Sequence, residues 1–179
     1  MLDLWDKIIH TENAMTEKIS TVINEMISYY SKDPRRINHF LKVYAFAKSI
    51  GELEKLDEET QDILEVAAVM HDIGIKISEE KYNSSAGNYQ EIEGPSVARG
   101  MLSKFNFDEK FIDRVCHLIG HHHTYNKIDG ADYQILIEAD FLVNIYEDEI
   151  KVIQVQSIKE KYFKTKSGMT FLINLYLKR

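Results

Sequence analysis

Helix-breaking residues are scarce in this chain, and this scarcity limits what it can fold into. Its 179 residues include only two prolines and eight glycines. Between these breakers, apolar residues recur at intervals of three and four, the spacing that lines one face of an α-helix. The composition suits a globular protein, because 44% of the residues are hydrophobic and 28% are charged. We therefore predict an all-α protein. The lack of an internal repeat, low-complexity tract or linker favours a single domain over residues 1–179.

Start and stop signals delimit the periodic segments. Pro34 and Gly51 are predicted to begin and end one helix, and Asp57 and Asp108 to cap the starts of two others. Residues 73–93 are rich in turn-forming residues and are predicted to be a loop; a loop of that length inside a domain is more often functional than not. The predicted helices cover residues 2–30, 34–50, 57–71, 95–102, 108–119 and 132–146, with one or two more within 149–179.

The sequence disfavours several classes of protein. No apolar run approaches the roughly 18 residues of a membrane span, and the N-terminal segment lacks the basic-then-apolar order of a signal peptide. Cys116 is the only cysteine, so no internal disulfide can form. The net charge of −7 argues against broad binding to nucleic acid, which needs clustered lysines and arginines. We expect a cytoplasmic protein with no membrane partner, and the sequence is compatible with a homodimer.

Histidines and acids within apolar segments are the residues that indicate chemistry. His71 and Asp72 follow an apolar helix directly before Gly74, and His39 lies within the apolar face of the second predicted helix. Adjacent helical residues point about 100° apart, so His71 and Asp72 can reach one metal ion only where the helix bends. Asp140 interrupts an apolar run. A carboxylate buried there needs a partner, because burying it alone costs free energy.

The order His39, then His71-Asp72, then Asp140 resembles the signature of the HD superfamily of metal-dependent phosphohydrolases. The segment AAVMHDIG over residues 67–74 is close to the commonest form of that family's His-Asp motif, and the separations of 32 and 68 residues fit its range. The resemblance covers about residues 30–150. It implies a helical bundle of the HD type with its core over this range, on which helices within 2–30 and 149–179 pack.

The resemblance also implies a metal site and an activity. His39, His71, Asp72 and Asp140 would hold one divalent metal ion, and this mixture of nitrogen and oxygen donors suits Mn, Fe, Co, Ni, Zn or, less well, Mg. A metal-activated water would then hydrolyse a phosphoester of a nucleotide or another small phosphorylated metabolite. The negative net charge does not exclude such a substrate, because a bound metal supplies a positive field locally.

A run of histidines, residues 121–123, follows the helix that Asp108 caps. Some branches of the family place one or two histidines at the matching point, where they bind a second metal ion or substrate phosphate. His121 best matches the first of that pair and His122 the second. Together with Asp72, they are the candidate acid and base residues. The run is also explained as solvated histidines that stabilise a helix C-terminus.

Gln90 marks a departure from the family pattern. Two-metal branches carry a histidine at the matching position, so its absence argues against a complete two-metal centre. Glu91 or Glu93 is available as a substitute oxygen ligand. We therefore expect one metal ion, and a second ion is left open.

Phosphate recognition needs cations, and three lie near the predicted ligands. Arg35 precedes His39 by four residues, so it lies on nearly the same helical face. Lys76 follows Gly74 by two residues, whereas many family members carry a lysine directly after that glycine. Lys127 lies just past the histidine run. All three are candidate substrate-binding residues, and each is also explained as a solvated surface charge.

Two other functions are compatible with the same residues. One is a metal-binding HD scaffold that senses or binds a ligand without turnover. The complete ligand set argues against it, because degenerate modules usually lose a His or an Asp. The other is oxidative chemistry at a di-iron centre, against which Gln90 argues.

Overall fold

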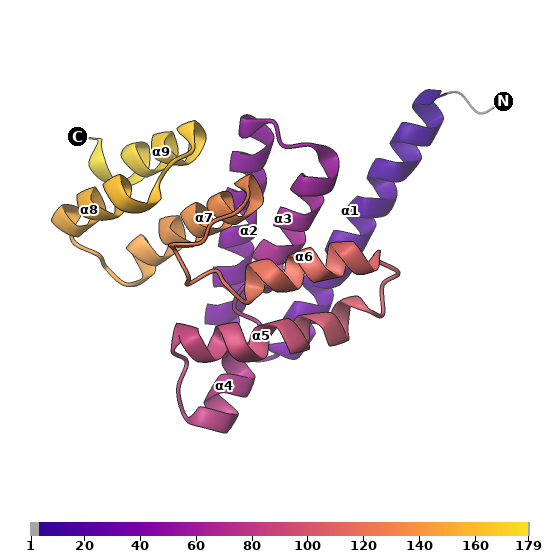
Figure 1. Cartoon of the computed structure of the whole chain (residues 1–179), viewed down its shortest axis with the longest axis horizontal. Coiled ribbons are helices and arrows are strands. Elements are labelled where there is room, and N and C mark those ends of the chain that lie inside the picture. The colour runs from indigo at the N-terminus through magenta and orange to yellow at the C-terminus, as the bar shows by residue number, and fades with distance from the viewer. Residues whose placement is uncertain (1–3, 179) are drawn as a thin grey trace.

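Over the residues that the structure describes, every regular element is a helix (Figure 1). The computed structural model describes the backbone of residues 4–178 and the side chains of residues 15–178, so residues 2 and 3 of the first predicted helix lie outside it. The predicted all-α, single-domain fold is confirmed. The elements are α1 (Leu4–Tyr29), α2 (Pro34–Glu54), α3 (Glu58–Met70), α4 (Ile75–Tyr82), α5 (Gly87–Leu102), α6 (Glu109–Ile119), α7 (Ala131–Glu147), α8 (Val152–Tyr162), α9 (Lys166–Leu172) and a π-helical turn (Ile173–Leu177).

Aspartate side chains cap the starts of three helices. Asp33, Asp57 and Asp108 accept hydrogen bonds from backbone N–H groups of the turn that follows, at 3.1, 3.0 and 2.9 Å. Each cap satisfies a donor that has no acceptor within its own helix. The predicted caps at Asp57 and Asp108 are therefore confirmed.

Gly51 does not end α2, so this prediction is wrong. The helix continues to Glu54, and Lys55 ends it in a left-handed conformation with φ of 61°. Gly51 is instead a buried contact point: a Cβ atom placed there would lie 2.2 Å from the Oε1 atom of Gln61 on α3. The glycine therefore reflects the close approach of α2 and α3, which a sequence pattern does not distinguish from a helix end.

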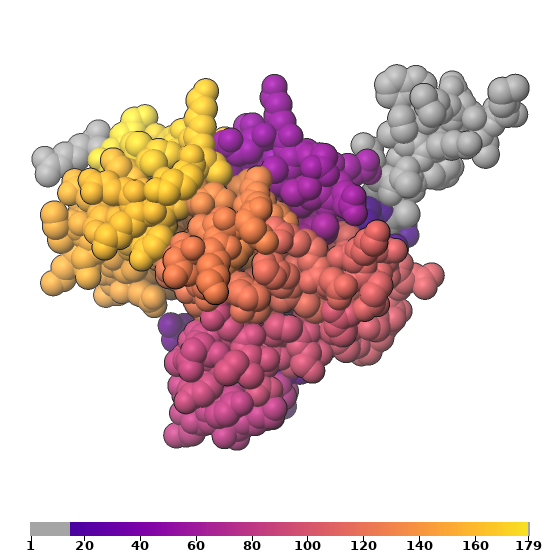
Figure 2. Space-filling model, viewed as in Figure 1, coloured from indigo at the N-terminus to yellow at the C-terminus, as the bar shows by residue number. Residues whose placement is uncertain are grey.

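The prediction of a loop over residues 73–93 is also wrong, because α4 and the first part of α5 occupy most of this segment. Only residues 83–86 connect the two helices, and Asn83 ends α4 with φ of 50°. Pro95, predicted to open a helix, lies inside α5. The segment forms the magenta lobe that projects at the lower end of Figure 2. Of its turn-forming residues, Asn83 ends α4 and Gly74 allows a close contact with the backbone of α5.

α3 is the central helix, and all its residues from Ile63 to Met70 are buried. α1, α2, α6 and α7 pack on it, while α2 also packs on α7, and α5 packs on α4 and α6 (Figure 1). The C-terminal α9 lies against α2 and α7. Within the described segment, no helix combines the length and apolar character that a membrane span requires.

The turn that follows α3 is fixed from two sides. The hydroxyl of Tyr30, directly after α1, donates to the carbonyl oxygens of Asp72 and Ile73 at 3.1 and 3.2 Å. On the other side, the backbone of α5 lies so close that a Cβ atom on Gly74 would be 2.7 Å from the backbone N of Gly94. Contacts with Tyr30 and with α5 therefore hold the bend that lets the side chains of His71 and Asp72 reach the same site.

We predict that Gly74→Ala destabilises the protein by about 1–3 kcal/mol, because backbone atoms cannot move aside for the added methyl group. Gly100→Ala is the matched control: Gly100 lies in α5, and a Cβ atom added to it would meet no other atom within 4 Å. In an exposed helix interior that change should stabilise by about 0.5–1 kcal/mol. Urea denaturation of both variants measures the difference. Equal stabilities would contradict the close packing at Gly74.

Candidate metal centre

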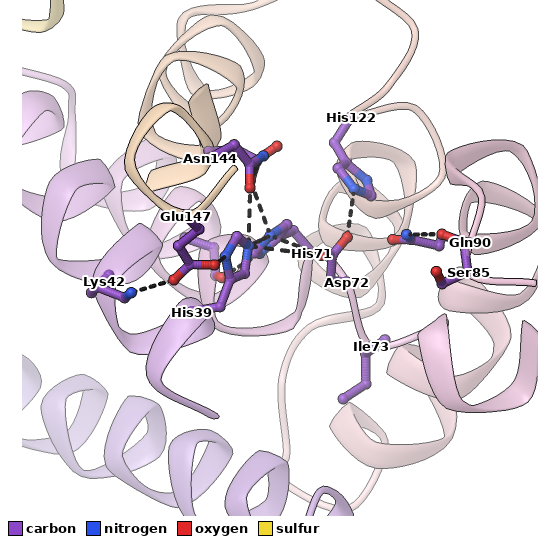
Figure 3. A network of polar contacts seen from close by, with 12 residues as sticks. His39, Lys42, His71, Asp72, Ile73, Ser85, Gln90, His122, Asn144 and Glu147 are labelled. Carbon is purple, nitrogen blue, oxygen red and sulfur yellow. Dashed lines mark hydrogen bonds and ion pairs between the residues drawn. The ribbon is translucent and has the colours of Figure 1, made fainter. Parts of the chain in front are cut away.

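The four side chains predicted as metal ligands lie close together where α2, α3 and α7 meet; Figure 3 shows His39, His71 and Asp72 among them. The Nε2 atoms of His39 and His71 lie 3.1 Å apart, and Oδ1 of Asp140 lies 3.4 and 3.6 Å from them. Oδ2 of Asp72 is 3.7 and 3.6 Å from the same two nitrogens. His39, His71 and Asp140 are buried, and Asp72 is partly exposed. His39, His71 and Asp140 therefore form one group of possible metal donors, and Asp72 lies beside both of its imidazoles.

Both imidazole rings are held with their Nε2 atoms towards that point. Nδ1 of His71 lies 2.9 Å from the carbonyl oxygen of Ala68, and Nδ1 of His39 lies 2.9 Å from Oε2 of Glu147. A carbonyl or carboxylate oxygen only accepts hydrogen bonds, so each Nδ1 carries a proton and donates it. The two Nε2 lone pairs then face each other, an arrangement that requires a positive charge between them. The donor set therefore fits a cation.

The electrostatics of the group lead to the same conclusion. Burial by itself lowers the pKa of His39, but the carboxylates of Asp140 and Asp72 outweigh it and raise the pKa to about 9. The same two carboxylates also outweigh burial at His71 and raise its pKa. In turn, burial raises the pKa of Asp72, but the imidazoles of His71 and His122 outweigh it and lower the pKa to about 2. Two ionised carboxylates thus favour positive charge at the imidazoles, as protons or as a metal ion.

The second carboxylate oxygen of Asp72 faces a different pair of histidines. Its Oδ1 lies 3.0 Å from Nε2 of His122 and 3.9 Å from Nε2 of His123. Nδ1 of His122 donates to the carbonyl of Ile119 at 2.8 Å, so Nε2 of His122 is also free to face a carboxylate or a cation. Asp72, His122 and His123 make a second group of possible metal donors beside the first.

Two buried polar atoms near this second group lack hydrogen-bond partners among the described residues. They are Nε2 of His123 and Oε1 of Gln90. The Nε2 atom of Gln90 donates to the carbonyl of Ser85 at 2.7 Å, which leaves the amide oxygen as the free end of a side chain that is only 6% exposed. Gln90 therefore presents an amide oxygen at the position where two-metal branches of the family carry a histidine.

Of the two histidines predicted as acid or base, the structure brings only His122 to Asp72. Nδ1 of His121 donates to the carbonyl of His117 at 2.8 Å, and its ring stacks on the His117 ring with centroids 4.4 Å apart. His123, rather than His121, is the second histidine near Asp72. His123 was not among the residues predicted from the sequence as an acid or base. The turn beyond α6 has no helical period from which the direction of each side chain could be read.

The two glutamates considered as substitute ligands have other partners. Glu91 accepts a hydrogen bond from the backbone N–H of His123 at 3.0 Å. Glu93 forms an ion pair of 2.6 Å with Lys81. Neither belongs to a donor group among the described residues.

A cavity of about 420 Å³ opens beside the donor atoms, and His39, Asp72 and Gln90 contribute to its wall. Ser85, in the α4–α5 connection, lines the same cavity. A volume of this order suits a small-molecule ligand. The donor groups are therefore accessible from one side and packed in the core on the other.

Among the three cations predicted to bind substrate, only Arg35 lines this cavity. The ammonium of Lys76 lies 4.8 Å from the ring centroid of Tyr29 and donates to the Tyr29 carbonyl at 3.4 Å. Lys127 is exposed in the α6–α7 connection. Of the three, Arg35 is therefore the cation placed to contact a ligand in the cavity beside the donor atoms.

Two further polar residues of the site were not predicted, and both follow Asp140 on α7 (Figure 3). Asn144 donates from Nδ2 to Oδ1 of Asp140 at 2.9 Å. Glu147 accepts from His39, as described above, and also pairs with Lys42. Asp140, Asn144 and Glu147 are spaced by four and three residues and so share one helical face. That polar stripe on an apolar helix is a signal that the sequence does contain.

The comparisons with known proteins agree with this geometry. The family model for the HD domain matches residues 36–155, a range that contains His39, His71, Asp72 and Asp140. A crystal structure of a predicted HD superfamily hydrolase from an uncultured Thermotogales bacterium is similar with a TM-score of 0.62 and 26% sequence identity. The similarity covers 89% of this chain and 84% of that one. No curated protein matches the sequence. Because the HD model spans more than half of the chain, this protein belongs to the HD domain family.

Proposed function

We propose that this protein is a metal-dependent phosphohydrolase that cleaves a phosphoester of a nucleotide or another small phosphorylated metabolite. The observation that carries the proposal is that donor atoms of His39, His71, Asp72 and Asp140 lie together beside an open cavity, whose wall includes His39 and Asp72. Membership of the HD family and the similarity to an HD superfamily hydrolase support it.

The residues of the site have separate proposed roles in metal binding, substrate binding and proton transfer. The Nε2 atoms of His39 and His71 and the carboxylates of Asp72 and Asp140 would hold a divalent ion of Mn, Fe, Co, Ni or Zn, with Mg a poorer fit. Bound there, the metal supplies Lewis acidity and a nucleophilic water at neutral pH. Arg35, at the cavity wall, would bind the substrate phosphate.

His122 is the proposed acid–base residue. Its Nδ1 proton is committed to the carbonyl of Ile119, so any further proton must be held at Nε2, which lies 3.0 Å from Oδ1 of Asp72. In the proposed reaction, this proton passes to the oxygen of a leaving group that binds beside Asp72, which lines the cavity. His121 has no such contact with Asp72, and we leave it out of the proposed mechanism.

The second donor group bears on the number of metal ions. One ion at the first group is sufficient for the proposed hydrolysis. Asp72, His122 and His123 would hold a second ion if two are bound, and a dinuclear iron centre would then favour oxidative chemistry over hydrolysis. Metal content per chain, with optical spectroscopy of any iron, distinguishes these cases.

The direct test is turnover by the purified protein. We expect phosphate release from at least one member of a panel of nucleotides and phosphorylated metabolites with Mn²⁺, and loss of turnover after chelation. Binding of one ion per chain without turnover on any substrate with any of the divalent metals would overturn the proposal and favour a binding scaffold.

Replacing a predicted ligand should remove metal and activity together. We expect His71→Ala and Asp140→Asn to lose the bound ion and the phosphatase activity while their helix content stays unchanged by circular dichroism. His117→Ala is the control, because His117 is partly exposed and pairs with Asp129 at 3.3 Å, outside the donor groups. Full metal content in either ligand variant would show that the ligand assignment is wrong.

Arg35→Ala should raise KM about tenfold with little change in kcat, which corresponds to about 1.4 kcal/mol of lost binding free energy. Lys76→Ala is a matched control, because Lys76 carries the same charge but lies against Tyr29 rather than in the cavity wall. Steady-state kinetics of both variants measure the effect. The reverse pattern, with KM raised only by the Lys76 change, would assign substrate binding to Lys76.

The metal-free protein should lose stability as the pH rises. The pKa of His39 is raised from its ordinary 6.5 to about 9, so the folded state binds its proton more tightly than the unfolded state does. The resulting stabilisation is complete below pH about 6.5 and lost as the pH rises through about 9. Thermal unfolding with a chelator should show this decline, and His39→Gln should reduce it. A flat profile in the wild type would refute the raised pKa.

A further inference from the structure

Two ways of holding an imidazole occur in this site. His71 and His122 each donate from Nδ1 to a backbone carbonyl three residues earlier, Ala68 and Ile119. Both stand just past the end of a helix, where the last carbonyls have no helical donor of their own and are free to accept. Their orientation is therefore a local consequence of the helix end.

His39 has no such local acceptor. It lies inside α2, where the carbonyls of the preceding turn accept from the helix backbone. Its Nδ1 instead donates to Oε2 of Glu147 at 2.9 Å, a residue 108 positions away on α7. The orientation of His39 therefore depends on a contact between two helices.

Glu147 is itself held by a second group from α2. Lys42, three residues after His39, forms an ion pair with Oε1 of Glu147, while Oε2 accepts from His39. One turn of α2 thus holds both oxygens of one carboxylate, as Figure 3 shows. The Glu147 side chain is 16% exposed and that of Lys42 is 44% exposed, so the carboxylate is mostly shielded and its partner reaches it from the surface.

We propose that Glu147 is a positioning residue that directs Nε2 of His39 to the metal position, with Lys42 holding Glu147 in place. This inference rests on the proposed metal centre. A carboxylate that accepts from one ring nitrogen fixes the tautomer and the ring orientation and makes the other nitrogen a better donor to a metal. Loss of such a partner typically weakens metal affinity by about 10–100-fold.

The test compares Mn²⁺ affinity in wild type, Glu147→Ala and Glu147→Gln, measured on metal-free protein by titration and without reference to activity. We expect Glu147→Ala to weaken binding by about 10–100-fold. Glu147→Gln should retain part of the affinity, because its amide oxygen still accepts from Nδ1 but carries no charge. Glu52→Ala is the control: Glu52 also pairs with a lysine of α2, at 3.1 Å, but is exposed and lies outside the site.

A spectroscopic readout separates positioning from general stability. In Zn²⁺-loaded wild type, the Nδ1–H proton of His39 should give a slowly exchanging NMR signal. Glu147→Ala should lose that signal while the corresponding signal of His71, held by Ala68, remains. Wild-type affinity and an unchanged His39 signal in Glu147→Ala would overturn this inference alone. Absence of metal binding by the wild type would overturn the proposed function with it.

Discussion

The structure depends on an electrostatic constraint at its centre, where two imidazole nitrogens face each other 3.1 Å apart between two carboxylates. Buried charges cost much free energy unless they are compensated. Here the compensation comes from opposite charges on α2, on α7 and in the turn after α3, so the site also links these three helices. His39 and Asp140 interrupt apolar helical faces because this centre, rather than a hydrophobic contact, occupies those positions.

The bend after α3 makes this centre possible. His71 and Asp72 are neighbours in sequence, and a continuing helix would point them about 100° apart. Tyr30 holds the carbonyls of the bend, and the absence of a side chain at Gly74 lets α5 cover it. Asp72 then directs one oxygen to the first donor group and the other to His122. The two groups of histidines are therefore joined through a single carboxylate.

The sequence pattern predicts helices correctly where apolar periodicity and local caps decide the structure. It fails where turn-forming residues have other roles. Asp57 and Asp108 cap helices as predicted, because a cap is a local interaction within four residues. The pattern is misleading at Gly51 and over residues 73–93. Their glycines, asparagines and serines serve close helix contacts and a short helix connection, which depend on elements distant in the chain.

The helical class and the order of His39, His71-Asp72 and Asp140 follow from the sequence alone, because helical periodicity is a local property and the spacing of a motif is fixed by the chain itself. The tertiary structure decided which neighbours of that motif take part. It brought His122 rather than His121 to Asp72, placed Arg35 rather than Lys76 or Lys127 at the cavity, and joined Glu147 to His39. These outcomes depend on the direction of side chains in turns and on contacts between helices. Both are fixed only when the helices pack.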